Sequence, residues 1–185
     1  MLRIISGQWK GIKIHEVDRD QTRPTTDKNK ESLFNSLGQY FEGGSVLDLY
    51  AGSGALGFEA LSRGMDYALF IDKAQPAIRT IHQNAQLLKL HPGIDYDVLH
   101  ADVLSTIHPR INRQFALILA DPPYQKELAE HTLQWIDQRN LLEPDGLIVI
   151  ESLKSYVFTH IPERLEIIKE KTSGITKFSY FQLRR

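Results

Sequence analysis

Short apolar segments alternate with segments of helical periodicity through most of the chain after residue 45. A short segment that is apolar throughout is typical of a strand buried on both faces of a sheet. We expect such strands at 46–50, 67–72, 96–100, 115–120 and 146–150. Apolar residues spaced by three and four predict helices between them, at about 55–63, from Pro76 to before Pro92, at about 127–138, and a short one after Asp102. Repeated strand–helix units form a parallel sheet with helices on both faces.

Both ends of the chain depart from this alternation. Residues 3–16 alternate around Gly7 and Gly11, which predicts a β-hairpin with Trp9 and Lys10 in its turn. Near the other end, Leu165–Lys171 and Thr176–Leu183 leave no room for a helix between them, so they predict a second hairpin. This hairpin would finish the sheet with an antiparallel strand.

A helix is expected between the first hairpin and the first buried strand. Thr25, Thr26 and Asp27 are candidate N-caps for it, because their side chains can accept from backbone N–H groups of the first turn. Its apolar face carries Leu33, Phe34, Leu37 and Phe41, and we expect it to end at Gly43-Gly44. The chain of 185 residues then forms one domain, 1–185, with an N-terminal extension at 1–44 and a core at 45–185.

Composition excludes several classes of protein. The chain has no cysteine, hence no disulfide and no thiolate metal site, and its seven histidines are scattered, so we expect no metal. No apolar run approaches the length of a membrane span, and the first residues do not resemble a signal peptide, which favours a cytoplasmic protein. Segments 1–32 and 151–185 are slightly basic and 33–150 is acidic. This asymmetry suits a polyanionic partner, although ordinary solvated surface explains it equally well.

Gly52-Ser53-Gly54 follows the first buried strand and opens a helix, with Gly57 completing a G-x-G-x-x-G pattern. Glycine lets a backbone approach a ligand closely, so the pattern favours a nucleotide-like ligand over a simple tight turn. Ala51 stands where a hydrolase elbow needs glycine, and no lysine follows Gly57 as in a phosphate-binding loop.

Acidic residues at strand ends decide which ligand fits. Asp48 lies within the first strand, Asp72 ends the second, and Asp102 and Asp121 follow the third and fourth. Ligands of open α/β sheets bind at this edge; Asp72 stands at the distance from Gly52 at which a carboxylate meets ribose hydroxyls, and Asp102 could accept from an adenine amine. Carboxylates repel a diphosphate but attract a sulfonium and an ammonium, so S-adenosylmethionine is preferred over NAD. Its expected site consists of Asp48, Tyr50, Ala51, Gly52, Ser53, Gly54, Asp72, Lys73, Asp102 and Val103.

Asp121-Pro122-Pro123-Tyr124 follows the fourth strand and indicates what receives the methyl group. The prolines stiffen the turn and remove two N–H donors. A carboxylate and a carbonyl can then accept both hydrogens of an exocyclic amine, which directs its lone pair towards an electrophilic methyl group. Tyr124 offers a ring on which a flipped-out base can stack. We expect Asp121, Pro122, Pro123 and Tyr124 to form the catalytic site, with a rigid loop and an aromatic plug as the alternative.

These motifs together resemble one family. The chain is similar to RsmD-type 16S ribosomal RNA (guanine-N2)-methyltransferases in residues 3–11, in Thr22 to Asp27 followed by 31–35, in 48–63, and in 121–124. The resemblance implies a Rossmann-like α/β fold with a seven-stranded, mostly parallel sheet and a C-terminal antiparallel hairpin. It also implies S-adenosylmethionine as donor, the N2 amine of a guanine in 16S rRNA as acceptor, and RNA contacts from Trp9, Lys10, Arg23, Thr25, Thr26 and Lys30. Asp72 in place of Glu, Lys28-Asn29-Lys30 in place of an arginine-containing segment, and Ser173-Gly174 in place of Tyr-Gly depart from the family pattern.

Other functions stay open at this point. A DNA adenine-N6 methyltransferase would use the same tetrapeptide, but usually with a separate target-recognition region. A protein glutamine methyltransferase usually has Asn in place of Asp121. An NAD-dependent oxidoreductase would not need the tetrapeptide, and a non-catalytic RNA-binding factor would need neither motif. For the favoured function, we expect a monomer that acts on 16S rRNA within a partly assembled 30S subunit, because the chain has little room for an RNA-binding domain.

Overall fold

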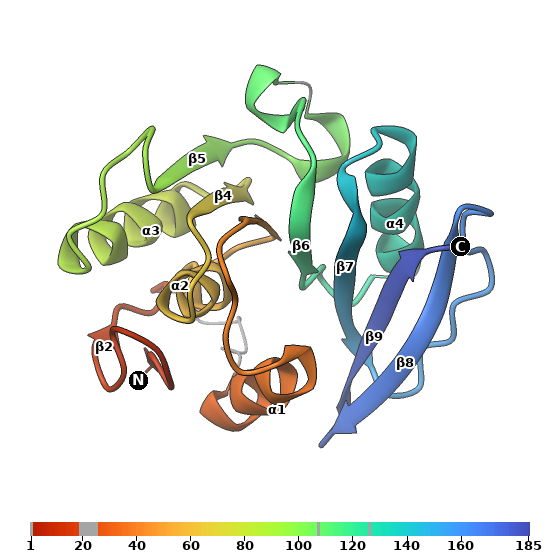
Figure 1. Cartoon of the computed structure of the whole chain (residues 1–185), viewed down its shortest axis with the longest axis horizontal. Coiled ribbons are helices and arrows are strands. Elements are labelled where there is room, and N and C mark those ends of the chain that lie inside the picture. The colour runs from red at the N-terminus through yellow and green to blue at the C-terminus, as the bar shows by residue number, and fades with distance from the viewer. Residues whose placement is uncertain (1, 19–25, 107, 126) are drawn as a thin grey trace.

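The computed structural model describes residues 2–18, 26–106, 108–125 and 127–185. Its main sheet has seven strands in the order β5-β4-β3-β6-β7-β9-β8 (Figure 1). Five are parallel: β3 (Ser45–Leu49), β4 (Tyr67–Asp72), β5 (Tyr96–His100), β6 (Phe115–Ala120) and β7 (Leu142–Leu153). The hairpin of β8 (Leu165–Ser173) and β9 (Thr176–Leu183) adds its second strand antiparallel to β7. The expected Rossmann-like α/β fold is confirmed.

Two apolar clusters sandwich this sheet because side chains alternate along each strand. One cluster contains Val46, Phe70, Leu117 and Val149, and it is covered by α1 (Asp27–Leu37), α2 (Ala55–Ser62) and α3 (Gln75–Leu87). The other contains Leu47, Ile71, Ile118 and Ile150 and is covered by α4 (Leu128–Gln138) and two short 3-10 helices, η1 (Val103–Ser105) and η2 (Pro109–Ile111). The same alternation places Asp48, Asp121 and Glu151 on the α1–α2 face of the sheet.

The expected end of α1 and both expected ends of β7 are wrong. Helix α1 ends at Leu37, because Gly38 leaves the helix with φ 88° and so terminates it before Gly43-Gly44. Strand β7 begins four residues earlier than expected, at Leu142, which pairs with Phe115 through an irregular register. The boundaries of β3 to β6 agree with the apolar pattern to within one residue, whereas β7 also runs on to Leu153 and β8 runs on to Ser173.

In the N-terminal extension, the first hairpin lies beside α2, and α1 lies near the β8–β9 hairpin (Figure 1). Strands β1 (Leu2–Arg3) and β2 (Lys13–Ile14) form the expected hairpin, with Trp9 and Lys10 in its turn. Thr26 caps α1 by accepting from the Asn29 N–H at 3.1 Å. On the opposite side of α1, Lys171 of β8 donates to the Ser32 carbonyl at 3.2 Å. The predicted RNA contacts Arg23 and Thr25 lie outside the described residues.

Within the described ranges, no helix combines the length and the apolar character that a membrane crossing requires.

Candidate functional site

The turn after β3 is held by Asp72, the last residue of the neighbouring strand β4. The Asp72 carboxylate accepts from the Gly52 N–H and from the Ala74 N–H, each at 2.9 Å. Gly52 and Gly54 have φ of 58° and 81°, a region that favours glycine. A Cβ built on Gly52 would meet nothing within 4 Å, so the outer face of this turn is open. The predicted ligand loop is therefore fixed to the sheet and accessible from outside.

Asp48 lies beneath the first turn of α2. Its carboxylate is 2% exposed and accepts from the Gly57 N–H at 3.0 Å. Burial, and secondarily the charges of Asp121 and Asp72, raise the pKa of this carboxyl well above its ordinary value. Gly57 is needed for this contact, because a Cβ there would come 2.3 Å from the Phe70 ring. Asp48 thus acts on the loop through the backbone of α2, and a nearby cation would favour its ionised form.

The segment Asp121 to Tyr124 begins beside the ligand loop. Strands β3 and β6 are paired with Leu49 level with Ala120, so Asp121 leaves the sheet next to Tyr50. Burial raises the pKa of the half-buried Asp121 carboxyl to about 7. The Pro123 carbonyl accepts from the Gln125 N–H at 2.6 Å, whereas the Pro122 carbonyl takes no part in the backbone hydrogen bonds of the described residues. The Tyr124 side chain is 47% exposed. A carboxyl, a backbone carbonyl and an exposed ring thus follow one another at the end of β6.

A further carboxyl on the next strand was not predicted. Glu151 of β7 follows Ile150, which is level with Ala120, and it is only 5% exposed. Burial, and then the charge of Asp121, raise its pKa to about 8. Among the described residues, its Oε2 atom has no hydrogen-bond partner. The sequence did contain a signal for this residue, because Glu151 directly follows the expected strand 146–150, just as Asp121 follows 115–120.

The other predicted cofactor residues take different positions. Asp102 is exposed and caps η1 by accepting from the Leu104 N–H at 3.2 Å, and Lys73 is also exposed. The Val103 side chain, by contrast, is buried in the α4-side core, so only its backbone could contact a ligand. The Tyr50 hydroxyl lies 2.8 Å from Thr132 of α4, which directs the ring to the far face of the sheet. The Val103 side chain and the Tyr50 hydroxyl are thus engaged on the α4 side of the sheet, and their expected role at the cofactor stays a prediction.

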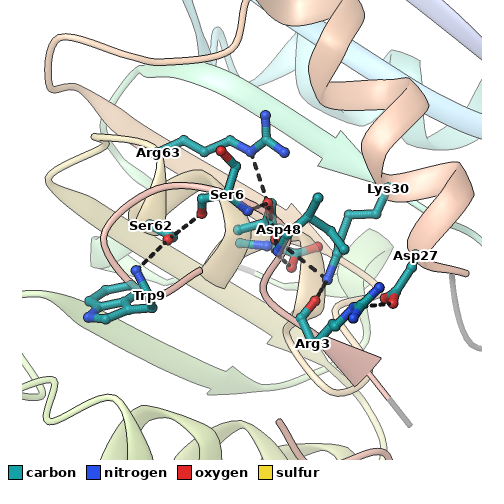
Figure 2. Close-up of polar contacts among 11 residues, drawn as sticks. Arg3, Ser6, Trp9, Asp27, Lys30, Asp48, Ser62 and Arg63 are labelled. Carbon is teal, nitrogen blue, oxygen red and sulfur yellow. Dashed lines mark hydrogen bonds and ion pairs between the residues drawn. The ribbon is translucent and has the colours of Figure 1, made fainter. Parts of the chain in front are cut away.

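Lys30 is not an RNA contact, because its side chain is fully buried. Its ammonium lies 3.5 Å from Glu59 of α2 and donates to the Arg3 carbonyl. Glu59 also accepts from Arg63 at 2.9 Å and from the Ile5 and Ser6 N–H groups at 3.0 and 3.1 Å. Figure 2 shows Lys30, Arg63 and Ser6 converging from α1, α2 and the N-terminal segment. This charge cluster, centred on Glu59, fastens the extension to the helix that begins at the ligand loop.

Trp9 lies at the wrong end of α2 to face the tetrapeptide. Its backbone N–H donates at 3.1 Å to the hydroxyl of Ser62, the last residue of α2, and its partly buried ring packs against the core (Figure 2). The ligand loop lies at the first residue of the same helix, and a helix of eight residues is about 12 Å long. Of the two alternatives, the structure thus shows the core anchor, while neighbouring Lys10 is exposed and remains a proposed RNA contact.

Asn84 ties the extension to the ligand loop directly. This fully buried residue of α3 donates to the carbonyls of Ser53 and His15, both at 3.0 Å, and its own carbonyl accepts from the His15 N–H at 2.7 Å. The chain after β2 and the loop after β3 therefore share one side chain. Helical periodicity alone marks Asn84 only as a residue on the apolar face, which is why the sequence did not identify it.

Comparison with known proteins places this arrangement among methyltransferases. The family model for conserved hypothetical protein 95 matches residues 2–182. The Bacillus subtilis protein named "Putative rRNA methyltransferase YlbH" is 39% identical over 99% of this chain and 100% of its own length. The ribosomal RNA small subunit methyltransferase D of Haemophilus influenzae is 35% identical, over 98% of this chain and 93% of that protein.

A solved structure has the same fold. The Escherichia coli protein described as "Putative methyltransferase yhhF" superposes with a TM-score of 0.83 at 31% identity, and the match covers 98% of this chain and 97% of that one. The extension and the core are both included in this match, because the coverage of each chain is nearly complete.

Proposed function

The chain belongs to the conserved hypothetical protein 95 family, that of the small-subunit rRNA methyltransferases D, and from this we propose that it methylates the N2 amine of a guanine in 16S rRNA, with S-adenosylmethionine as donor. One observation carries the assignment. The Asp121 carboxyl and the Pro122 carbonyl stand at the end of β6, beside the open ligand loop that follows β3. Acceptors for an amine therefore adjoin the site expected to hold the donor.

The residues present fit S-adenosylmethionine. The open outer face of Gly52 leaves room for a ligand against the loop backbone. Asp48 is buried with its pKa well above the ordinary value, so a sulfonium or ammonium nearby would stabilise its charged form. Asp102 is exposed at the end of β5, where it could accept from an adenine amine, and Asp72 and Lys73 border the same loop. When bound, the cofactor supplies an electrophilic methyl group.

The tetrapeptide would hold and orient the acceptor. Ionised Asp121 and the Pro122 carbonyl accept the two hydrogens of the guanine N2 amine and so direct its lone pair away from the protein backbone. The ring of Tyr124 supports the base from its exposed position. Asp121 is also placed to take the proton that the nitrogen loses as it gains the methyl group. Because the reaction needs no covalent enzyme intermediate, positioning and electrostatics carry most of the rate enhancement.

We also propose that the substrate is a partly assembled 30S subunit and that the protein acts as a cytoplasmic monomer. The described residues of the extension are committed to packing on α2 and on the β8–β9 hairpin, which leaves a small surface for recognising naked RNA. The exposed Lys10, together with the expected contacts Arg23, Thr25 and Thr26, would lie at the RNA.

The proposal is tested by methyl transfer from labelled S-adenosylmethionine to 30S particles from a strain lacking the enzyme. Nuclease digestion and mass spectrometry then identify the product, which we expect to be N2-methylguanosine at one position of 16S rRNA. Label in adenine, in protein, or nowhere would refute the assignment. Protein-free 16S RNA is assayed in parallel, and equal rates on both substrates would refute the preference for an assembled particle.

A further inference from the structure

Glu151 is a buried acid to which the proposed reaction gives no role. Its side chain is 5% exposed, and Oε2 accepts no hydrogen bond from any residue that the structure describes. Buried carboxyl oxygens nearly always have a partner, since an unsatisfied one costs about 1–3 kcal/mol. The fold itself derives no benefit from this atom. A donor brought by a ligand would satisfy it.

The position of Glu151 identifies where such a ligand would be. Strands β6 and β7 are paired in parallel with Ala120 level with Ile150, so Asp121 and Glu151 start from adjacent strands about 4.8 Å apart. Side chains alternate along a strand, and both residues share the face of Leu119 and Val149. On the other side of β7, Glu151 is level with Phe178, which is 1% exposed and closes that direction. Glu151 is therefore a close neighbour of Asp121, whose charge acts on it.

We propose that Glu151 is a specificity residue for the acceptor base, and that its carboxylate accepts the hydrogen bond of guanine N1–H while Asp121 and the Pro122 carbonyl hold the N2 amine. This inference rests on the proposed function. Guanine presents N1–H and N2–H₂ as neighbouring donors on one edge. Adenine and cytosine place a ring nitrogen that accepts beside their amine, so a carboxylate there would face a lone pair. Two adjacent carboxyls thus favour guanine over the bases that other enzymes with the same tetrapeptide methylate.

The protonation of the pair agrees with this role. The pKa values of Asp121 and Glu151 are raised to about 7 and about 8, so in the free protein near neutral pH the two carboxyls hold at least one proton between them. The charge of Asp121 acts on Glu151 and on Asp48, so these neighbouring charges are carboxyls as well. Guanine offers three hydrogens to these acceptors, and its binding would release that proton. Two neighbouring carboxyls of this kind are suited to a donor edge.

The test compares guanine with 2-aminopurine at the methylated position. 2-Aminopurine keeps the amine, but its N1 accepts a hydrogen bond. The position is first mapped by mass spectrometry, and 16S RNA carrying either base there is then assembled into 30S particles. We expect the wild-type protein to lose at least about 30-fold in kcat/KM with 2-aminopurine, and Glu151→Gln, whose amide can donate to N1, to narrow this ratio to about 3-fold. Glu143→Gln, on the same strand but at its other end, should keep the wild-type ratio.

Each outcome decides between alternatives. The affinity for S-adenosylmethionine, measured calorimetrically, should be equal in the wild type and Glu151→Gln. If the variant slows both substrates equally, Glu151 has only a structural role and the proposal fails. A wild-type protein that methylates 2-aminopurine as well as guanine overturns it without any variant, which covers the case of a variant that does not fold. If the wild type methylates no guanine at all, the proposed function fails and the inference fails with it.

Discussion

Two sets of buried carboxyls differ in what surrounds them. Glu59, in the charge cluster of the extension, faces Lys30 and Arg63 and accepts two backbone N–H bonds. Asp121 and Glu151 lie on adjacent strands at the carboxyl end of the sheet, and burial raises the pKa of both. A buried charge with its counterions inside the fold serves the fold. Asp121 and Glu151 form no ion pair with a cation among the described residues, so their charged forms are costly to the fold, and a ligand that brings charge or donors would offset that cost.

The largest expected effect comes from removing the acceptor of the amine. Asp121→Ala should lower kcat by about 10²–10³-fold, because one preorganised group is lost from the transition state. Its affinity for S-adenosylmethionine should stay within about 2-fold, since the loop contacts of Asp48 and Asp72 remain. Single-turnover methylation of 30S particles and calorimetry measure the two quantities. Asp145→Ala, an exposed carboxyl on β7, is the matched control, and equal rates for both variants would contradict the assignment.

Changing the charge cluster centred on Glu59 should instead lower the stability of the fold. Lys30→Met leaves Glu59 buried beside one cation in place of two, and we expect a loss of about 3 kcal/mol in the free energy of unfolding. Urea denaturation followed by circular dichroism measures it. Lys28→Met on the exposed face of the same helix should change the free energy by less than about 0.5 kcal/mol. If Lys30→Met is as stable as the wild type, the cluster does not fasten the extension.

The ring of Tyr124 should contribute a smaller amount through stacking. Tyr124→Ala removes the platform for the base and should reduce kcat/KM by about 10-fold to 100-fold, whereas Tyr124→Phe should retain most activity because a phenyl ring still stacks. Steady-state kinetics on 30S particles distinguish the two. A Phe variant as impaired as the Ala variant would show that the hydroxyl, not the ring, is the functional group.

Strand positions and strand-end acids could be predicted from the sequence because both follow from local patterns. Apolar segments gave the core strands, and the acids at their ends gave Asp48, Asp72 and Asp121, which the parallel sheet then brought to one edge. Lys30 was misjudged because a lysine on a polar helix looks solvated. Its burial depends on Glu59, 29 residues away and on another helix.

Glu151 was missed for a related reason. Its significance comes from lying beside Asp121 across the β6–β7 pair, and a linear sequence does not show which strands are neighbours. Asn84 likewise gains its role only when α3 meets both the ligand loop and the end of β2. Contacts between elements distant in sequence are therefore the part of the site that required the structure.

The most direct test of the difference between the Glu59 cluster and the Asp121–Glu151 pair is the pH dependence of the stability of Asp121→Asn. A carboxyl whose pKa is raised to about 7 in the folded protein destabilises the fold increasingly as pH rises from its ordinary pKa to that value. The neutral Asn avoids this cost. We therefore predict that Asp121→Asn is more stable than the wild type, and that its advantage in urea unfolding is about 2–3 kcal/mol larger at pH 9 than at pH 5. A variant less stable than the wild type at pH 9 would show that Asp121 supports the fold, and would contradict the division between paired and unpaired carboxyls.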